Sequence, residues 1–128
     1  MKALLDTHTF LWWVTDDPRL SAGARKILAD GENTFVVSAC VAWELVIKVR
    51  IGKLTLPDEP GRYIPDRMSL YAFEGLAIEF RHVLHLETLP NHHRDPFDRI
   101  LIAQSLVEKL PILTADGIVS RYGVEVFW

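Results

Sequence analysis

The chain has 128 residues, of which 49% are hydrophobic and 24% are charged. This length suits a single domain over residues 1–128, and the hydrophobic content supports a buried core and excludes intrinsic disorder. The net charge of -3 argues against a protein that coats nucleic acid non-specifically, because such a protein would be basic. The single cysteine, Cys40, excludes an internal disulfide, and its apolar surroundings predict a buried thiol.

No segment has the pattern of a membrane anchor or a signal peptide. No apolar stretch reaches the ~18 residues that a membrane span requires. Asp6 falls where a signal peptide would need its apolar region. We therefore expect a soluble, cytoplasmic protein with no membrane partner.

The first third of the chain alternates apolar runs with helical patterns. Residues 2–5 are an apolar run that predicts a buried strand. A helix is predicted over 7–15, ending before Pro18. Ser21 is placed to cap the next helix, over 21–30.

The middle of the chain repeats this alternation. Residues 34–37 are β-branched and aromatic, which predicts a second strand. Ser38 is placed to cap a longer helix that runs to about residue 51, and Gly52 is placed to close it. Residues 54–60 are expected to form a loop.

The remaining elements continue the pattern to the end of the chain. They are a helix over 62–73, a strand over 76–80, a short helix over 81–86, a polar loop over 90–96, a helix over 96–109, and strands over 112–114 and 124–128. Strands that alternate with helices, and early strands that are continuously apolar, predict an α/β layered domain with a mostly parallel sheet.

Acidic residues stand where apolar runs meet predicted helices: Asp6, Glu44, Asp95, Asp98 and Asp116. A charge in such a position costs free energy unless something uses it. Ligands of open parallel sheets bind beyond the carboxyl ends of the strands. Asp6, Glu44, Asp98 and Asp116 can all reach one such edge, although the sequence does not define the strand order.

Clustered carboxylates repel one another unless a cation lies between them. Ligand sets made only of oxygen suit Mg²⁺ or Mn²⁺. A metal in such a pocket polarises a phosphate and activates a bound water, so the pattern favours phosphodiester hydrolysis. Asp98, in the first turn of its helix, is a strong candidate ligand.

Several of these acids also have a purely structural explanation. Asp6 and Asp95 could each cap the helix that follows, and Asp116 could belong to a simple turn. Glu44 could pair with Lys48, four residues later, on an exposed helix face. The apolar neighbours of Glu44 favour a functional role instead.

Other polar residues lie close to these acids in the sequence. Thr7 and Thr114 could supply hydroxyl groups behind the ligands. Arg94 and Arg99 could contact the phosphates of a nucleic acid, or could pair with acids. His92 and His93 invite comparison with a zinc site, but adjacent histidines rarely share one metal, so a loop role or a nucleic-acid contact is favoured.

Three segments resemble the PIN-domain nucleases, and within them the VapC toxins: LLDTHTFLWW, SACVAWELVIKVRIGKL and HRDPFDRILIAQSLVEKLPILTAD. They cover over half of the chain in the order and spacing of that family. The resemblance implies a Rossmann-like α/β/α sandwich. It also implies that Asp6, Glu44 and Asp98 are the core metal ligands and catalytic acids, with Asp116 as a more variable fourth. Asp95 would lie behind the ligands or cap its helix.

The resemblance further implies an activity and partners. A VapC-like protein would be an endoribonuclease that uses Mg²⁺, or Mn²⁺ as a substitute, on RNA such as tRNA or ribosomal RNA. It would act as the toxin of a toxin–antitoxin pair, be held inactive by a VapB-like antitoxin, and form a homodimer.

Two other functions compete with this interpretation. The first is a Mg²⁺-dependent aspartyl-phosphate phosphatase or receiver-type domain, which also places an aspartate at a strand end. Such phosphatases need a second aspartate where this chain has His8, and a receiver needs an acceptor aspartate where the predicted strand over 76–80 is followed by Arg81. The second is a PIN-like binding module without activity, which would lack acids that this chain retains.

Overall fold

The computed structural model describes all of residues 1–128. One sheet of five parallel strands lies at its centre, with the strand order β3-β2-β1-β4-β5. The strands are β1 (Lys2–Leu5), β2 (Thr34–Ser38), β3 (Glu74–Leu76), β4 (Ile112–Leu113) and β5 (Val126–Phe127). The all-parallel sheet, flanked by helices, confirms the predicted α/β class.

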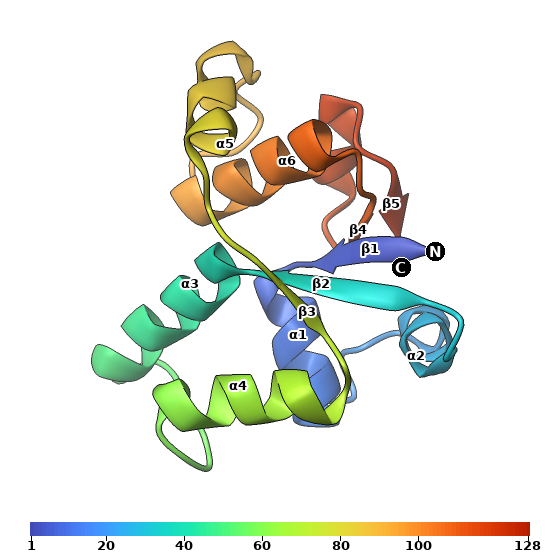
Figure 1. Ribbon diagram of the computed structural model, residues 1–128, viewed down its shortest axis with the longest axis vertical. Helices are drawn as coiled ribbons and strands as arrows, with labels where there is room; N and C mark the ends of the chain where they lie inside the picture. Colours follow the sequence, from blue (N-terminus) through green and yellow to red (C-terminus); the bar gives the residue numbers. More distant parts are fainter.

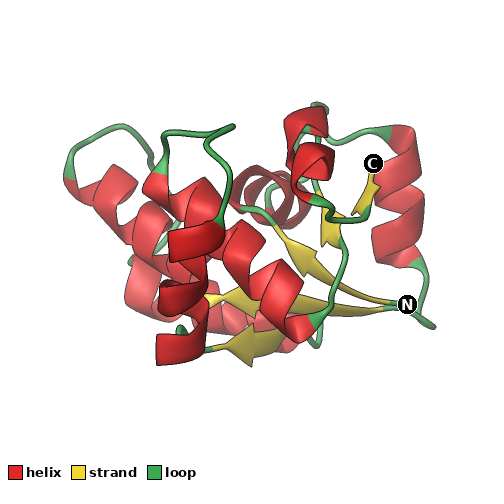
Figure 2. Cartoon of the chain, turned by 90° about the horizontal axis from the view of Figure 1, so that it is seen from above, coloured by secondary structure: helices red, strands yellow, loops and turns green.

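Helices cover both faces of this sheet. They are α1 (Thr7–Val14), α2 (Ala22–Ala29), α3 (Ala39–Arg50), α4 (Pro60–Leu70), α5 (Phe80–His85) and α6 (Pro96–Glu108), with 3-10 turns η1 (Leu86–Thr88) and η2 (Gly117–Tyr122). Helices α1 and α4 lie on one side of the sheet, and α5 and α6 lie on the other (Figure 1). The view from above shows the strands twisting between these layers (Figure 2). The predicted sandwich is therefore present.

Two of the predicted helix starts depend on serine caps. The Ser21 hydroxyl accepts a hydrogen bond from the backbone N–H of Ala24 at 2.9 Å. The Ser38 hydroxyl accepts from the backbone N–H of Cys40 at 3.1 Å. Each hydroxyl satisfies an N–H group that has no partner within the helix, which is why these helices start where the sequence predicts.

The strand predicted over 76–80 is wrong in its position. The observed strand, β3, ends at Leu76, and helix α5 begins at Phe80. The reason lies in a cap that the pattern of apolar residues does not reveal. The Glu79 backbone N–H donates to Nδ1 of His82 at 2.9 Å, so Glu79 starts a helix instead of ending a strand. The 3-10 turn η2 was also not predicted.

The strand order creates a switch point between β1 and β4. From β1 the chain crosses through α1 and α2 to β2, on one side of β1, whereas β4 pairs with β1 on its other side. Connections that leave neighbouring strands in opposite directions open a crevice at their carboxyl ends, and ligands of α/β proteins bind there. The register pairs Leu5 with Leu113, so the residues after these two strands face the same crevice.

A cluster of 23 buried apolar residues fills the space between the sheet and the helices. Leu4, Leu5 and Leu113, on the central strands, are fully buried. Cys40 is buried, as its apolar surroundings predict. No helix combines the length and the apolar character that crossing a lipid bilayer requires.

Candidate functional site

Asp6 lies at the switch point and is held by both of its carboxylate oxygens. Oδ1 accepts a hydrogen bond from the backbone N–H of Thr9 at 2.8 Å, which caps α1. Oδ2 accepts from the hydroxyl of Thr114, the residue that follows β4. The capping explanation and a ligand role are therefore compatible, because each carboxylate oxygen keeps a further lone pair for a cation.

Glu44 reaches the same crevice from the second turn of α3. Its Oε1 accepts a hydrogen bond from the Thr7 hydroxyl at 2.6 Å, and its Oε2 forms an ion pair with Lys48 Nζ at 2.9 Å. The Glu44 side chain is only 13% exposed, so this pair is not the solvated surface pair that its spacing allows. Thr7 and Lys48 orient the carboxylate at the crevice.

Asp95 and Asp98 stand at the start of α6 and differ in role. The Asp95 carboxylate accepts from the backbone N–H groups of Phe97 at 2.8 Å and of Asp98 at 3.3 Å. These bonds confirm that Asp95 caps the helix. Asp98 is half-buried, and no hydrogen bond satisfies its carboxylate within the chain.

The pKa of Asp98 indicates that three other acids lie near it. Burial, the largest cause, and repulsion from Asp95, Glu44 and Asp116 together raise this pKa from 3.8 to about 6, whereas His93 opposes the shift. Neighbouring carboxylates disfavour each other's ionised form when no cation lies between them. The shift therefore indicates a crevice that is short of positive charge.

Asp116 completes the group at the turn after β4. Its Oδ1 accepts from the backbone N–H of Ile118 at 3.0 Å and caps η2. Its Oδ2 contacts Nε2 of His93 at 2.6 Å. Its own backbone N–H donates to the Thr114 hydroxyl at 3.0 Å, and that hydroxyl donates to Asp6. A single chain of hydrogen bonds thus joins Asp116 to Asp6.

The four predicted acids come from four separate segments. Thr114 joins Asp116 to Asp6, the hydroxyl of Thr7 beside Asp6 bonds to Glu44, and Glu44 and Asp116 both raise the pKa of Asp98. Together with the hydroxyls of Thr7 and Thr114, the four acids offer oxygen atoms only. This donor set fits a hard divalent cation such as Mg²⁺ or Mn²⁺ better than a soft metal. The fit rests on the chemistry of the donors and on the raised pKa of Asp98.

The two arginines proposed as phosphate contacts have different positions. Arg94 is exposed in the loop before α6. The guanidinium of Arg99 instead donates to backbone carbonyl oxygens, at 2.8 Å for Pro90 and 3.3 Å for Leu89. Since these bonds engage the Arg99 side chain in holding the loop, we do not extend the RNA-contact prediction to it.

Sequence reasoning favoured a loop role or an RNA contact for His93 and missed its contact with Asp116. Its ring is 10% exposed and bridges Asp116 and Tyr122, with Nδ1 at 2.9 Å from the Tyr122 hydroxyl. Asp116 is 23 residues away in the sequence. The only sign was a histidine in the polar loop directly before the acids of α6, which by itself does not identify a partner.

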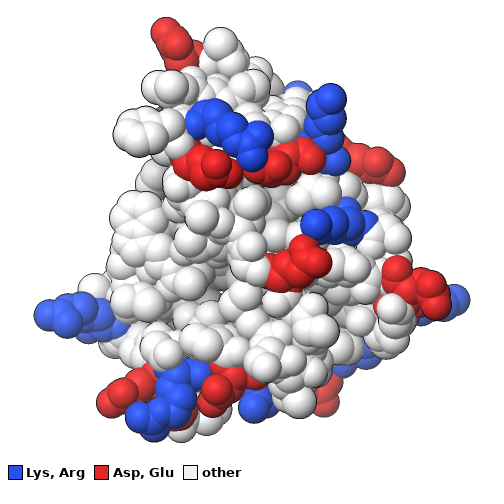
Figure 3. Space-filling view, viewed as in Figure 1, with Lys and Arg blue, Asp and Glu red and all other residues white.

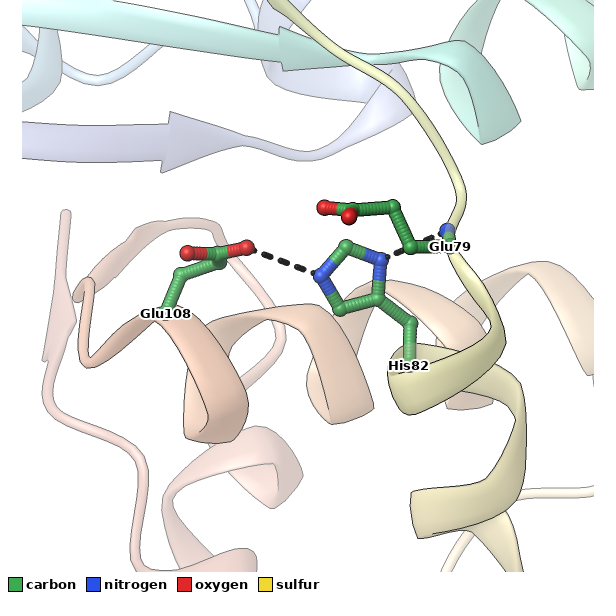
Figure 4. Close-up of side chains that lie close together, drawn as sticks. All are labelled: Glu79, His82 and Glu108. Atoms are coloured by element: carbon green, nitrogen blue, oxygen red, sulfur yellow. Dashed lines mark hydrogen bonds and ion pairs between the residues drawn. The ribbon is translucent and has the colours of Figure 1, made fainter.

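The group of side chains whose ligand atoms all lie within 4.8 Å of one another is not these four acids but Glu79, His82 and Glu108 (Figure 4). His82 is fully buried, and its Nε2 lies 2.9 Å from Glu108 Oε1. Its Nδ1 accepts from the Glu79 backbone N–H, so the ring proton must be on Nε2, where it donates to Glu108. A metal at Nε2 would displace that proton to Nδ1, against the Glu79 N–H.

A cation already lies between these carboxylates. The Arg81 guanidinium bonds to Glu79 Oε1 at 3.2 Å and to Glu108 Oε1. We therefore interpret this group as a structural lock between α5 and α6. The oxygen-lined crevice is the better candidate metal centre.

Basic side chains do not form a continuous tract on the face shown in Figure 3, where Lys and Arg lie among Asp and Glu around a broad uncharged area. This agrees with the net charge of -3. Any attraction for a polyanion on this face must therefore come from local groups.

A parallel α/β sandwich with acids near its switch point defines a class of protein, the Rossmann-like domains with acidic residues beyond the strand ends. The chain belongs to the PIN domain family, whose family model matches residues 3–125. This confirms the family resemblance. The phosphatase alternative gains no support, because the ring of His8, at the position where a second acid is needed, lies against Trp12.

One relative in sequence is Ribonuclease VapC16 of Mycobacterium tuberculosis, which is 39% identical over 72 residues. The match covers 53% of this chain and spans about half of the relative, 51% of its length. This similarity is therefore local, and the activity of the relative is not transferred to this chain by the match alone.

Solved structures share the fold over the whole chain. The DNA-bound VapBC from Salmonella typhimurium has a TM-score of 0.69 at 16% identity, covering 98% of this chain and 96% of that one. VapBC2 from Rickettsia felis, bound to a promoter fragment, has a TM-score of 0.68 at 14% identity and covers 100% of both chains. FitAcB from Neisseria gonorrhoeae has a TM-score of 0.67 at 20% identity, covering 100% and 97%. At these identities the likeness shows the fold alone.

Proposed function

We propose that this protein is a metal-dependent endoribonuclease in which Asp6, Glu44, Asp98 and Asp116 hold Mg²⁺, or Mn²⁺ as a substitute. The observation that carries this proposal is the network at the ends of β1 and β4: Thr114 joins Asp6 to Asp116, and burial with the charges of Glu44 and Asp116 raises the pKa of Asp98. Family membership and the local similarity to a ribonuclease support it. We further propose that residues 1–128 act as one PIN domain.

The residues of this chain have separate tasks in the proposed reaction. When bound, a divalent ion activates a water for attack on the RNA phosphodiester and balances the charge that develops on the phosphate. Thr114 holds Asp6, and Thr7 with Lys48 holds Glu44, so these carboxylates are oriented before the substrate arrives. When the cation is absent, the Asp98 carboxyl group holds its proton up to a pH of about 6.

Substitution of the acids tests the activity. Purified protein, freed of any partner, should cleave single-stranded or loop RNA with Mg²⁺ or Mn²⁺ and not with a chelator. Asp6→Asn and Glu44→Gln remove a ligand charge with little change in shape, so each should reduce cleavage to background. Gel analysis of labelled RNA measures this result.

The matched controls are exposed acids outside the crevice. Asp66→Asn on α4 and Glu32→Gln in the turn before β2 make the same chemical changes and should leave cleavage unchanged. Circular dichroism should show a folded protein in every case. Full activity in both crevice variants would exclude the proposed site.

The biological setting proposed is a toxin–antitoxin pair in the cytoplasm, with this chain as the toxin and a VapB-like antitoxin as its inhibitor. Support comes from the relative named VapC16 and from neighbours in fold whose structures are VapBC complexes. We propose tRNA or ribosomal RNA as the target class. A small DNA-binding protein encoded beside this gene, copurifying with the chain, would be the expected partner.

We also propose that the chain forms a homodimer. Its surface carries large exposed apolar side chains, including Phe80, which is 87% exposed, and Trp43, which is 56% exposed. Such side chains are costly in water when they gather in patches, and they often mark interfaces. Light scattering measures the mass in solution, and a mass of 14.6 kDa at all concentrations would exclude the dimer.

A further inference from the structure

The loop before α6, which runs from residue 90 to residue 95, is held firmly against the rest of the domain. The Arg99 guanidinium donates to the carbonyl oxygens of Pro90 at 2.8 Å, Leu89 at 3.3 Å and His93 at 3.4 Å. Three bonds to carbonyl groups within residues 89–93 fix the backbone of this segment. His93 is therefore presented from a rigid position, although it lies in a loop.

The His93 side chain lies between Tyr122 and Asp116. Its ring stacks on the Tyr122 ring with centroids 5.5 Å apart and an interplanar angle of 28°. Nδ1 lies 2.9 Å from the Tyr122 hydroxyl, and Nε2 lies 2.6 Å from Asp116 Oδ2. Both ring nitrogens are thus engaged, and the ring plane is fixed by stacking as well as by bonds.

The bond partners assign the direction of each hydrogen bond. The Tyr122 hydroxyl oxygen accepts from the backbone N–H of His92 at 3.0 Å, which leaves the phenolic proton free to donate to His93 Nδ1. With Nδ1 as an acceptor, the neutral ring carries its proton on Nε2 and donates it to Asp116. One tautomer therefore satisfies all three contacts.

Asp116 receives this bond on the oxygen that its own turn does not use. Oδ1 accepts from the Ile118 backbone N–H, and Oδ2 accepts from His93. A carboxylate held only at Oδ1 could still rotate about that bond. The second bond, to His93, determines which lone pairs face the crevice.

We infer that His93, held by the Tyr122 hydroxyl, is a positioning residue that orients the Asp116 carboxylate toward the cation. This inference rests on the nuclease function proposed above. Histidines and carboxylates that bind metals are commonly held by partners behind them, and loss of such a partner weakens metal affinity or activity roughly 10- to 100-fold. A purely structural tie between the loop and η2 would predict a loss of stability without this effect.

Metal affinity measured without RNA tests the inference. Mn²⁺ binding, followed by calorimetry, should weaken roughly 10- to 100-fold in His93→Ala. Tyr122→Phe keeps the stacked ring and removes only the hydroxyl, so it should weaken binding in the same direction by a smaller factor. His93→Gln retains an N–H donor and should recover part of the affinity that His93→Ala loses.

A double variant separates a positioning role from a structural one. If His93 acts through Asp116, the combination of His93→Ala with Asp116→Ala should bind Mn²⁺ as weakly as Asp116→Ala alone. Additive losses in the double variant would overturn the inference. Thermal unfolding checks that each variant is folded before its Mn²⁺ affinity is compared. If His93→Ala does not fold, Tyr122→Phe replaces it in the comparison.

The matched control is His92→Ala. His92 lies beside His93 in the same loop, is exposed, and packs edge-on against Tyr122 at 4.9 Å, but its side chain makes no hydrogen bond. The His92→Ala variant should bind Mn²⁺ like the native protein.

The outcomes separate the two proposals. Suppose that Glu44→Gln and Asp98→Asn abolish Mn²⁺ binding. If His93→Ala and Tyr122→Phe then leave it unchanged, only the positioning role fails. If none of these variants changes binding, the metal pocket itself is excluded.

Discussion

At the scale of single residues, Asp98 links electrostatics to the proposed function. Burial and three neighbouring carboxylates raise its pKa from 3.8 to about 6. Burial also raises the pKa of the Cys40 thiol, to about 11, and Glu44 and Asp98 make smaller contributions in the same direction. The thiol is therefore protonated and unreactive at neutral pH, mainly because it is buried. The negative charges of Glu44 and Asp98, which add to this shift, are suited to a cation.

The shift of Asp98 has a definite sign in the stability of the protein. Between pH 3.8 and about 6 the folded protein holds a proton on Asp98 that the unfolded chain has released. The free energy of unfolding of the metal-free protein should therefore fall as the pH rises through this window. Above this pH window, the ionised Asp98 lowers the free energy of unfolding by its full amount. Mg²⁺ should then raise the melting temperature, because a bound cation offsets the repulsion between the carboxylates.

Melting temperatures measured across this pH window, with and without Mg²⁺, check the prediction. Asp98→Asn cannot ionise, so it should lose this pH-dependent step and most of the stabilisation by Mg²⁺. Asp66→Asn, an exposed aspartate, should keep both. A native protein that gains nothing from Mg²⁺ above pH 6 would contradict it.

At the scale of elements, helix starts were predictable where a cap is local. Ser21, Ser38 and Asp95 accept bonds from N–H groups within three residues, so short sequence patterns contain the whole interaction. The boundary between β3 and α5 was not predictable in this way. It depends on His82, whose ring is oriented by Glu108, 26 residues later in α6.

The lock between α5 and α6 should be structural. His82→Ala leaves the buried end of this lock without the ring that joins the Glu79 N–H to Glu108, although Arg81 still contacts Glu108, and it should lower the free energy of unfolding by roughly 1–3 kcal/mol. His85→Ala, on the same helix, removes a ring that makes no side-chain hydrogen bond and should cost much less. Urea unfolding measures both changes.

Metal addition provides a second measure of this lock. Because Arg81 already supplies the cation between Glu79 and Glu108, Mn²⁺ affinity should be the same in His82→Ala as in the native protein. A loss of Mn²⁺ affinity in the folded His82→Ala protein would instead make this group a metal site.

At the scale of the whole molecule, the strand order determines which acids meet. Asp6 follows β1 and Asp116 follows β4, and these strands are neighbours although about a hundred residues separate them. Helix α3 contacts α1 and α6, which carries Glu44 toward the other acids. The convergence is therefore a property of the topology and not of any one segment.

The proposed toxin role belongs to this scale because it concerns the protein in a cell. Expression of the chain without an antitoxin should arrest growth, since unrestrained cleavage removes RNA that translation needs. Asp98→Asn should relieve the arrest by removing a ligand of the proposed metal, whereas Asp66→Asn should not. Growth curves after induction measure the effect, with equal expression checked by immunoblot. An arrest that persists with Asp98→Asn would indicate toxicity by another route.

The sequence by itself determined the α/β class, most of the elements and the candidate acids. Apolar periodicity, capping serines and the cost of placing a charge in an apolar run are local properties, so they can be recognised from neighbouring residues. Only the tertiary structure decided the strand order, the bonds that orient each acid, and the partnership of His93 with Asp116. These depend on contacts between distant segments, such as Leu5 with Leu113, whose geometry no local pattern contains.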